Sequence, residues 1–472
     1  MTRRNVPATG IEAVASTVGA PPVSGATVTG VSDDSRTVAH GDLFLCIRGA
    51  SVDGHSKASD AVSRGAVALV VDTRLDLDVP QVVVPDVRAA VGPVVSTLLG
   101  TPSTKIRTVG VTGTNGKTST VTFVAGLLSA CGARPTVIGT LTGVRTTPEP
   151  LELQGLLADA VTAGDTHCVM EVSSHAMVMH RADGIVFDVC AFTNLGRDHL
   201  DFHASMEDYF AAKASLFEPA HCATAVVNTD DDHGRTLATA LSVPCATVSA
   251  AMLADIGVTA TSVSFTWRSL RCHAPVGGTF SVVNLHLALE ICVALGMEPT
   301  RLAEACSELV APAGRFESVP TAGGYNVIVD YAHTPEALAE LLRSVRALGP
   351  RNVTVVFGCG GDRDPGKRPA MGAVAAELAD RVVVTSDNPR SEDPHAIIAA
   401  VVAGTSGGTA VVDAIEDRAA AIESAISGAG SGDIVVIAGK GHESHQEIHG
   451  RLTEFSDTEV ARNAVRRKDG TR

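Results

Sequence analysis

Short apolar segments alternate with longer segments of helical spacing from about residue 325 to residue 439. The apolar segments are rich in Val and Ile, which is typical of strands; they are YNVIVD, NVTVVFG, RVVVTS, TAVVDA and DIVVIAG. A helical segment separates each from the next, and PEALAELLRSVRALG is the clearest of these. Strands that alternate with helices predict a parallel sheet covered on both faces. We place this α/β domain at residues 314–472.

Two further α/β regions precede this one. In residues 1–104, the strands expected are VTGV, DLFLCI, AVALVVD and QVVVP, and VRAAVGPVVSTLLG is an expected helix. In residues 105–313, the segments IRTVGVTG, CVMEVS, FDVCAFTN and TAVVN predict a second, mostly parallel sheet. The boundary before residue 314 falls in APAGRF, which is rich in small residues. The final VRRKDGTR predicts a frayed basic end.

Composition excludes several classes of function. The 472 residues allow about three domains at ~150 residues each. A net charge of −15 disfavours binding to nucleic acids and to anionic membranes, and 3% aromatic residues disfavour base stacking. No apolar run reaches the ~18 residues that a membrane span needs, and the start lacks a signal-peptide pattern. Ten cysteines without a CxxC pair fit a reducing compartment, so we expect a cytoplasmic protein, and a monomer.

A glycine-rich segment follows a predicted strand and opens a predicted helix. It consists of Gly113, Thr114, Asn115, Gly116, Lys117, Thr118 and Ser119. Glycines let backbone N–H groups surround a phosphate, and the helix N-terminus favours negative charge. Lys117 is placed to reach the β- and γ-phosphates, and Thr118 to bind Mg²⁺. The common phosphate-loop pattern has Gly where this chain has Val111, so the segment predicts a variant phosphate loop.

Acidic and imidazole side chains follow two other strands of the same region. Glu171 ends the strand in CVMEVS, and Asp198-His199-Leu200-Asp201 follows FDVCAFTN. Open parallel sheets bind ligands at the carboxyl ends of their strands, where these groups could complete the coordination of Mg²⁺. A surface acid and a helix-capping histidine explain the same residues, and the sequence leaves both interpretations open. Lys213 taken alone, on an apolar helix, predicts a surface lysine.

Seven segments together resemble the Mur ligases, and more closely the UDP-N-acetylmuramoyl-tripeptide synthetases among them. The segments are GTNGKTST, MEVSSHAM, FTNLGRDHLDFHASMEDYFAAK, VDYAHTPEAL, FGCGGDRDPGKRP, DNPRSED and AGKGHE. The resemblance covers nearly the whole chain, in order. The resemblance implies a small N-terminal α/β domain for the UDP-linked substrate. It also implies a central phosphate-loop ATPase domain and a Rossmann-like C-terminal domain for the amino acid.

The same resemblance implies an ATP and metal site. The ATP-binding residues it implies are Gly113, Thr114, Asn115, Gly116, Lys117, Thr118, Ser119, Asn284, Arg315 and Asp330. The implied catalytic residues are Lys117, Lys213, His199 and Glu171. The implied Mg²⁺ ligands are Thr118, Glu171, His199 and Lys213, the last as a carbamate formed from its amine and CO₂. ATP is then expected between domains, whose closure completes the site.

Two substrate sites are also implied. The residues expected at UDP-MurNAc-L-Ala-D-Glu are Ser32, Asp34, Ser35, Arg36, Thr146, Thr147, Ser173 and Arg181. In this family the DNPR form accompanies meso-diaminopimelate, and the residues expected to hold it are Arg363, Asp387, Asn388, Pro389, Arg390, Gly439 and Glu443. Arginine suits the second carboxylate of this amino acid, and Glu443 suits its second ammonium. Without the family resemblance, a polar turn explains residues 32–36, and a surface ion pair explains Arg390.

The reaction implied is an ATP-dependent ligation through an acyl phosphate. The substrate carboxylate attacks the γ-phosphate, ADP leaves, and the amino acid's amine then displaces phosphate. Three alternatives stay open on the sequence: an L-lysine-adding ligase, a folylpolyglutamate synthetase, and a nucleotide-binding module without catalysis. A nicotinamide dehydrogenase is rejected because the glycines of FGCGGDRDPG do not fit the dinucleotide pattern. A serine hydrolase at Ser173-Ser174-His175 is disfavoured because G-x-S-x-G is absent.

Overall fold

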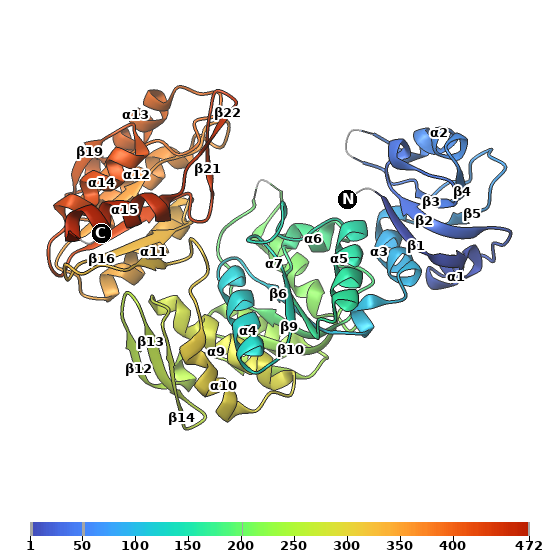
Figure 1. The fold of residues 1–472 in the computed structure, drawn as a ribbon, viewed down its shortest axis with the longest axis horizontal. Helices are drawn as coiled ribbons and strands as arrows, with labels where there is room; N and C mark the ends of the chain where they lie inside the picture. Colours follow the sequence, from blue (N-terminus) through green and yellow to red (C-terminus); the bar gives the residue numbers. More distant parts are fainter. Residues whose placement is uncertain (1–2, 50–51, 201, 471–472) are drawn as a thin grey trace. The chain divides into compact units, whose positions relative to one another are not determined.

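The computed structural model describes residues 3–49, 52–200 and 202–470 of the chain. The protein consists of two units, and Figure 1 shows the elements of both. The first unit combines Met1–Ser249 with Leu287–Glu298, and the second combines Ala250–His286 with Pro299–Arg472. The three large sheets are mainly or wholly parallel and alternate with helices, which confirms the α/β class expected from the sequence.

The first unit begins with a five-stranded sheet in the order β1-β2-β3-β4-β5. β1 runs antiparallel to β2, and the other neighbours are parallel. The sequence pattern does not predict β1, because Val6 is its only buried residue; an ion pair of 2.7 Å from Arg3 to the buried Asp42 ties the strand to β3. The elements are β1 (Arg3–Gly10), α1 (Ile11–Thr17), β2 (Thr27–Ser32), β3 (Asp42–Leu45), α2 (Ala58–Ser63), β4 (Ala66–Val71), β5 (Gln81–Val83) and α3 (Val87–Leu98).

The second sheet of this unit is wholly parallel and has the order β11-β10-β9-β6-β8-β7. β6 therefore lies in the interior of the sheet, with β8 and β9 on either side. The strands are β6 (Arg107–Thr112), β7 (Pro135–Ile138), β8 (His167–Glu171), β9 (Phe187–Phe192), β10 (Cys222–Asn228) and β11 (Cys245–Val248). The helices are α4 (Lys117–Ala130), α5 (Pro150–Ala163), α6 (Ser174–Val178), α7 (Met206–Ala214) and α8 (Asp232–Ala240). This order brings the loops after β6, β8 and β9 to one edge.

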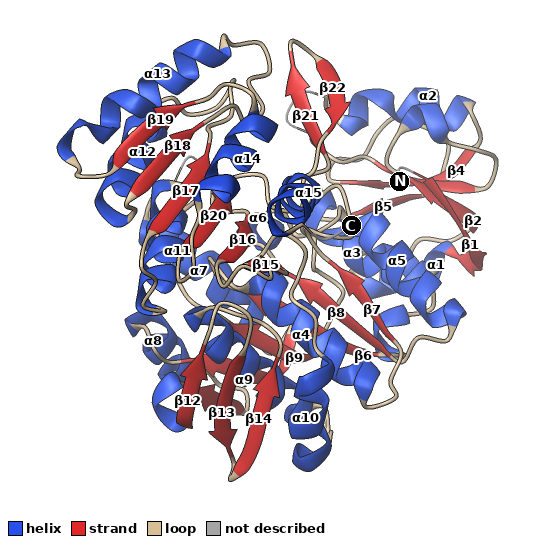
Figure 2. Cartoon of the chain, turned by 60° about the vertical axis from the view of Figure 1, so that its left-hand side comes forward, coloured by secondary structure: helices blue, strands red, loops and turns tan. Residues whose placement is uncertain are grey.

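The main sheet of the second unit has the order β15-β16-β20-β17-β18-β19, and only β15 is antiparallel. Alternate residues of β17 and β20 enter two separate hydrophobic cores, one on each face. Helices α11, α12 and α13 pack on one face, and α14 and α15 on the other (Figure 2). The strands are β15 (Glu317–Val319), β16 (Asn326–Asp330), β17 (Val353–Phe357), β18 (Arg381–Val384), β19 (Val411–Ala414) and β20 (Ile434–Ala438). The helices are α11 (Pro335–Ala347), α12 (Lys367–Leu378), α13 (Pro394–Gly404), α14 (Arg418–Gly428) and α15 (Asp457–Asp469).

The end of the chain differs from the prediction. Residues 465–469 were expected to be frayed, but they continue α15. Ser456 caps this helix, its first turn is acidic and its last turn is basic, which complements the helix dipole. Val465 and two alanines of α15 are buried against the sheet. The prediction was wrong because the segment was judged by its charge, although one face of the helix is apolar.

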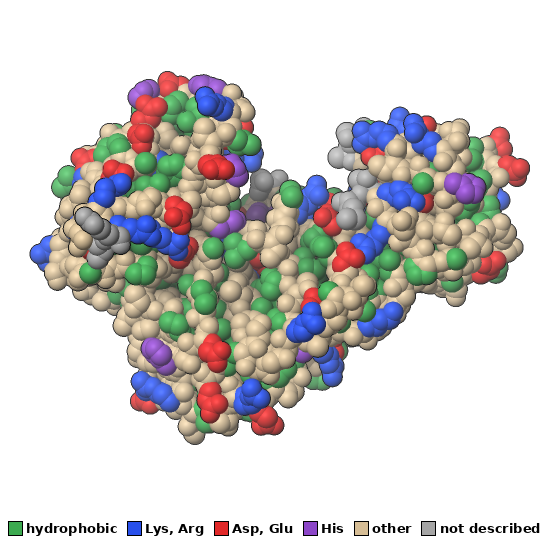
Figure 3. Space-filling view, viewed as in Figure 1, with side chains coloured by type: hydrophobic (Ala, Val, Ile, Leu, Met, Phe, Trp, Pro, Cys, Tyr) green, Lys and Arg blue, Asp and Glu red, His purple; other side chains and the backbone are tan. Residues whose placement is uncertain are grey.

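Smaller elements complete the two units. β12 (Ala254–Val258), β13 (Val263–Trp267) and β14 (Leu270–Ala274) form an antiparallel sheet. The remaining elements are α9 (Thr279–Ala294), α10 (Pro299–Ala305) and the hairpin β21 (His445–Ile448) and β22 (Arg451–Glu454). Among the described residues, no helix is both long and apolar enough to cross a membrane. On the face drawn in Figure 3, acidic and basic side chains are interspersed.

Candidate active site

The glycine-rich loop joins β6 to the first residue of α4. Gly113 and Gly116 have positive φ angles of 145° and 85°, which side chains rarely adopt. A Cβ on Gly113 would also lie 1.8 Å from Thr193 Oγ1, so the close approach of the two loops requires glycine. Lys117 folds over the loop, and its Nζ donates to the carbonyl oxygens of Gly113 (2.9 Å) and Thr114 (2.8 Å). The geometry is that of a phosphate loop at a helix N-terminus.

The loop that follows β9 braces this phosphate loop. The Asn115 N–H donates to Asn194 Oδ1 (3.0 Å), and Thr193 Oγ1 donates to the Asn115 carbonyl oxygen (2.6 Å). The Thr114 hydroxyl lies 3.1 Å from the Tyr209 hydroxyl of α7. The sequence analysis gave Asn194 no role. Its position at the end of a strand beside β6 was the signal that could have identified it.

Glu171, at the end of β8, faces the start of α4. Its carboxylate is buried and accepts the Thr118 hydroxyl at 3.1 Å to each oxygen. The Thr140 N–H donates to Glu171 Oε1 at 2.9 Å. Hydroxyl and carboxylate oxygens are the donors that Mg²⁺ prefers, so Thr118 and Glu171 fit a magnesium site next to the phosphate loop. The structure thus brings together two of the four predicted metal ligands.

Lys213 is not the surface lysine that its helix alone predicted. Only 1% of it is exposed, and its Nζ donates to the Gly113 carbonyl oxygen at 2.7 Å. The ammonium also lies 4.4 Å from the ring centroid of Tyr209. Burial, reinforced by the Lys117 ammonium, lowers the pKa of Lys213 well below its usual range, although Asp198 opposes this. The side chain therefore contacts the phosphate loop and loses its proton more easily than an ordinary lysine.

His199 lies in the loop after β9 with a positive φ of 54°. Its imidazole is 43% exposed, 4.8 Å from the ring of His175 and 6.0 Å from that of Tyr209, measured between centroids. The neighbouring Asp201 lies outside the described residues. Across the described ranges, no group of three or more His, Cys, Asp or Glu side chains is arranged to hold a metal. Only Glu171 and His199 of the predicted ligand set are of these residue types, so this absence does not test the set. The metal role of the four predicted ligands stays a prediction.

Four residues predicted at the peptide substrate lie together beside Glu171. Thr147 Oγ1 donates to the Glu171 carbonyl oxygen (2.9 Å) and accepts the Ser173 N–H (3.1 Å). Arg181 donates to the Thr147 carbonyl oxygen at 3.2 Å and pairs with Glu149 at 2.8 Å. The Thr146 hydroxyl contacts that of Thr140 at 3.0 Å. The segments after β7 and β8 are therefore joined into one polar surface next to the candidate metal site.

The predicted nucleotide-sugar residues Ser32, Asp34, Ser35 and Arg36 form a local turn after β2. Ser32 Oγ accepts the Asp34 N–H (3.2 Å), and the Asp34 carboxylate binds Arg36, whose side chain is 83% exposed. These contacts fit the polar-turn interpretation as well as the substrate site. Asp33, which the sequence analysis did not select, is more unusual. Its Oδ1 is buried without a hydrogen-bond partner in the described chain, and burial raises the pKa of Asp33 to about 6.

The predicted amino-acid residues of the second unit also come together. Asn388 Nδ2 donates to Glu443 Oε2 at 2.9 Å, which joins the loops after β18 and β20. A Cβ on Gly439 would lie 2.9 Å from Asp387 Oδ2, so glycine allows this approach. Lys440, to which the sequence analysis gave no role, is fully buried and binds both Asn388 (3.0 Å) and Glu443 (2.9 Å). Only the tertiary packing reveals that this lysine is internal.

Arg390 is held in a constrained conformation beside this cluster. Its φ is 53°, its Nη1 donates to the Gly361 carbonyl oxygen at 2.7 Å, and its Nε lies 3.6 Å from Glu447. A Cβ built on Gly360 would lie 2.9 Å from Arg390 Nη1 and 3.8 Å from Arg363 Cγ, so both arginines flank that glycine. Pro389 is buried next to Arg390. The two arginines predicted at the second carboxylate therefore lie beside the same glycine.

Two of the predicted ATP residues, Arg315 and Asp330, lie next to the first two strands of the second unit's main sheet. Arg315 precedes β15, and Asp330 ends β16. The half-buried Asp330 accepts the N–H groups of Phe316 (2.7 Å) and Ala332 (2.8 Å) on its carboxylate. Burial raises the pKa of Asp330, and Arg315 opposes this shift. The Arg315 guanidinium lies 4.6 Å from the Tyr331 ring centroid. Asn284, the third such residue, is buried on α9, and its contact with ATP stays a prediction.

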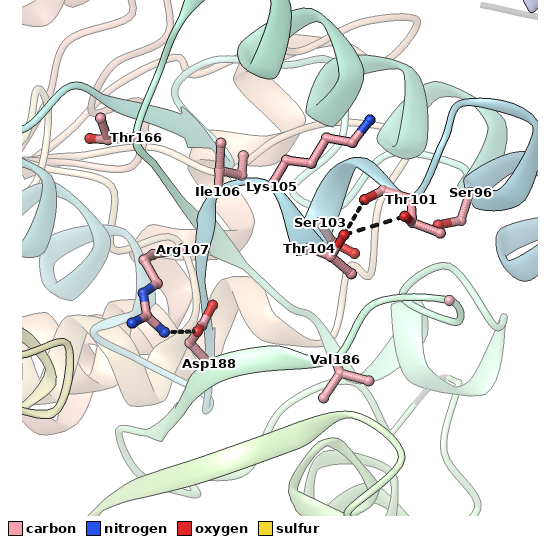
Figure 4. A pocket seen from close by; sticks show the side chains of 11 residues that line it. Ser96, Thr101, Ser103, Thr104, Lys105, Ile106, Arg107, Thr166, Val186 and Asp188 are labelled. Carbon is pink, nitrogen blue, oxygen red and sulfur yellow. Dashed lines mark hydrogen bonds and ion pairs between the residues drawn. The ribbon is translucent and has the colours of Figure 1, made fainter. Parts of the chain in front are cut away.

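A pocket of about 410 Å³ lies elsewhere in the first unit, around Arg107 and Asp188 (Figure 4). These two side chains form an ion pair of 2.6 Å, and most of the other lining side chains are hydroxyls. Arg107 begins β6, whereas the phosphate loop follows its last residue. Parallel sheets bind substrates at the carboxyl ends of their strands. This pocket is at the opposite end and is not part of the candidate active site.

Family models match most of the chain. The Mur ligase family catalytic domain matches residues 27–98, the Mur ligase middle domain residues 111–292, and the Mur ligase glutamate ligase domain residues 314–441. The chain belongs to the Mur ligase family. This membership makes the protein an ATP-dependent ligase, so the binding module without catalysis is no longer an explanation.

Curated relatives of this Mur ligase are similar over nearly their whole length. The UDP-N-acetylmuramoyl-L-alanyl-D-glutamate–2,6-diaminopimelate ligase of Syntrophomonas wolfei is 40% identical over 93% of this chain and 95% of its own. The ligase of the same name from Geobacillus kaustophilus is 41% identical over 92% of this chain and 94% of its own.

Solved structures have the same architecture. A structure of a ligase of that name has a TM-score of 0.69 and 33% identity, covering 92% of this chain and 94% of its own. Folylpolyglutamate synthase of Mycobacterium tuberculosis, solved with ADP and AMPPCP, has a TM-score of 0.59 and 18% identity, covering 81% of this chain and 96% of its own. The latter similarity concerns the fold alone.

Proposed function

We propose that this Mur ligase adds meso-2,6-diaminopimelate to UDP-MurNAc-L-Ala-D-Glu, with ATP as co-substrate, during peptidoglycan precursor synthesis. One observation carries the proposal: relatives named for this ligation are 40–41% identical across 92–93% of the chain. We further propose that residues 1–104, 105–313 and 314–472 serve the UDP-linked substrate, ATP and the amino acid, respectively. The protein would act in the cytoplasm as a monomer on these small molecules.

The first unit supplies the groups for phosphoryl transfer. The N–H groups of the phosphate loop and the Lys117 ammonium would bind the β- and γ-phosphates and stabilise the charge that develops there. Thr118 and Glu171 would hold Mg²⁺, with His199 and Lys213 as further ligands. A bound Mg²⁺ would neutralise phosphate charge. The polar surface of Thr146, Thr147, Ser173 and Arg181 would orient the carboxylate of the peptide substrate toward the γ-phosphate.

Carbamylation of Lys213 is the role that its surroundings support. A neutral amine adds CO₂ to form a carbamate and releases one proton. The buried position and the lowered pKa of Lys213 increase the fraction of neutral amine. The product is a carboxylate next to the phosphate loop, which suits Mg²⁺ coordination. This chemistry gives a role to a buried lysine whose hydrogen bond within the described chain is to a backbone carbonyl oxygen.

The second unit supports diaminopimelate over L-lysine as the amino acid. Both amino acids carry two amines, but only diaminopimelate has a second carboxylate. Arg390 and Arg363 flank Gly360 and provide the cations that this carboxylate needs, and Glu443 provides an acid for the ammonium beside it. Asp387, Asn388, Pro389 and Gly439 would complete the pocket.

Phosphate release tests the proposal directly. The purified protein is incubated with ATP, Mg²⁺ and UDP-MurNAc-L-Ala-D-Glu, and meso-diaminopimelate or L-lysine is added in parallel. We expect rapid release with diaminopimelate and little with L-lysine, and none from Lys117→Ala. Release with lysine alone would keep the ligase and refute the assignment of the arginines. Release that instead requires a folate substrate would favour the folylpolyglutamate synthetase alternative.

A further inference from the structure

Lys440 is a fully buried cation at the centre of the predicted amino-acid pocket. Its Nζ lies 3.0 Å from Asn388 Oδ1 and 2.9 Å from Glu443 Oε2. Both partners are predicted to contact the amino acid, whereas Lys440 has no exposed surface from which to do so. A buried ammonium is costly unless it is paired, so its presence here requires these two contacts.

The first contact fixes the orientation of the Asn388 amide. An ammonium group only donates hydrogen bonds, so the oxygen of Asn388 must face Lys440. The Glu447 backbone N–H donates to the same oxygen at 3.0 Å, which requires the same orientation. Nδ2 then points to Glu443 and donates to Oε2 at 2.9 Å. One of the two Nδ2 hydrogens is used in this way, and the second is available for a ligand.

The second contact fixes the Glu443 carboxylate. Oε2 accepts from both Lys440 and Asn388, whereas Oε1 takes part in no hydrogen bond within the described chain. Burial alone would raise the pKa of Glu443, but Lys440 and Asn388 hold it below its usual value. Glu443 is therefore anionic at neutral pH and presents Oε1 as an acceptor.

We propose that Lys440 is a positioning residue, which holds Asn388 Nδ2 and Glu443 Oε1 side by side as a donor and an acceptor for the amino acid. This pair matches the carboxylate and the ammonium that one end of an α-amino acid carries side by side. Arg390 and Arg363 both flank Gly360, and a Cβ on that glycine would lie 3.9 Å from the Asn388 carbonyl oxygen. The inference rests on the proposed function, because it assigns Lys440 to the amino-acid pocket of that reaction.

Substitution Lys440→Met tests this role, because it removes the charge and keeps a similar length. We expect KM for diaminopimelate to rise at least about tenfold, as is typical when a charged hydrogen bond is lost. We expect KM for ATP and for UDP-MurNAc-L-Ala-D-Glu to stay within about twofold, because Lys440 acts only through Asn388 and Glu443. In the double variant with Glu443→Gln, the two effects on KM should be less than additive, since Lys440 acts in part through the Glu443 carboxylate.

Lys468→Met is the matched control. Lys468 lies in the same unit, outside the pocket, and donates to the backbone oxygens of Ile426, Ser427 and Ala429. Its loss should lower the melting temperature without changing KM for diaminopimelate. Lys440→Gln, which keeps a donor for Asn388 but no charge, provides a second variant if Lys440→Met does not fold; we expect an intermediate KM.

Two results separate the failure of this inference from that of the proposed function. An unchanged KM for diaminopimelate in both Lys440 variants, beside an active wild-type protein, would overturn the role of Lys440 alone. Additive effects of Lys440→Met and Glu443→Gln would do the same. A wild-type protein that releases phosphate with neither diaminopimelate nor lysine would overturn the proposed function and this inference with it.

Discussion

Burial changes the chemistry that a single lysine can perform. Lys213 lies on a helix where the sequence alone predicts a solvated side chain, yet it contacts the phosphate loop and the Tyr209 ring. The sequence could not show this, because the phosphate-loop carbonyl oxygen that Lys213 binds lies 100 residues earlier in the chain. The family resemblance supplied the role of Lys213, and its burial supports that role.

Lys213→Ala should lose activity and regain part of it with short carboxylic acids. The alanine leaves a space where a small carboxylate can replace the carbamate. We expect turnover to fall at least about a hundredfold, the range typical of lost charge stabilisation in a phosphoryl-transfer site. Phosphate release with and without added acetate or formate measures both effects. Lys57→Ala, at an exposed position, is the control. Full activity of Lys213→Ala would exclude the carbamate.

Asp33 should make the protein less stable as pH rises. Burial raises the pKa of Asp33 to about 6 in the folded protein, above the value of about 3.8 expected in the unfolded chain. The folded state therefore binds the proton more tightly, and its stabilisation, on the order of 3 kcal/mol, is present below pH 4 and lost as pH rises through 6.

Asp33→Asn removes this titration. We expect the variant to gain stability relative to the wild type between pH 4 and pH 7, since asparagine carries no charge to bury. Urea unfolding at several pH values measures the difference in free energy of unfolding. The same difference at pH 4 and pH 7 would show that Asp33 does not titrate in this range.

At the scale of elements, apolar alternation was the reliable signal. Each strand predicted after residue 325 exists, because Val and Ile at alternate positions fill the two cores of one sheet. β1 and the hairpin β21–β22 were missed, since only one of their side chains is buried. The loops that carry the candidate site could be predicted, because they lie at the ends of predicted strands. Lys440 and Asn194 could not be assigned, because their roles depend on contacts between distant loops.

The last helix is tied to the second unit by a buried ion pair. Arg418 of α14 binds Asp457 of α15 at 2.7 Å, both side chains are fully buried, and Arg418 also donates to the Ala438 carbonyl oxygen at 2.9 Å. The contact joins the helix to the sheet at the strand end that precedes Gly439 and Lys440. α15 is therefore a structural support for the loop that carries the amino-acid pocket.

Arg418→Ala should destabilise the second unit strongly. The substitution leaves Asp457 as an unpaired buried charge, which typically costs about 3–5 kcal/mol. Urea unfolding followed by circular dichroism measures the loss. Arg467→Ala, which breaks an exposed ion pair with Glu423 on the same two helices, should change stability by less than about 1 kcal/mol. Equal effects of the two substitutions would show that burial does not determine the strength of the pair.

At the scale of the whole molecule, the candidate groups divide between the two units. The phosphate loop, Glu171 and Lys213 belong to the first unit, and the cluster around Asn388 and Arg390 belongs to the second. Substitutions in separate clusters that share no partner act independently in general. A change in the amino-acid pocket should therefore alter the parameters for the amino acid without altering those for ATP.

Arg390→Lys is the variant that tests this separation. Lysine keeps the charge but lacks the planar pair of donors that binds a carboxylate at two points, and it must adopt the same positive φ. We expect KM for diaminopimelate to rise about tenfold or more, while KM for ATP stays within about twofold. Steady-state phosphate release with each substrate varied in turn measures both. Arg381→Lys is the control for the loss of an arginine from the same sheet. The Arg381 side chain pairs with Asp413 on β19. A parallel rise of both KM values would mean that Arg390 supports the fold of the enzyme, and that another group recognises the second carboxylate.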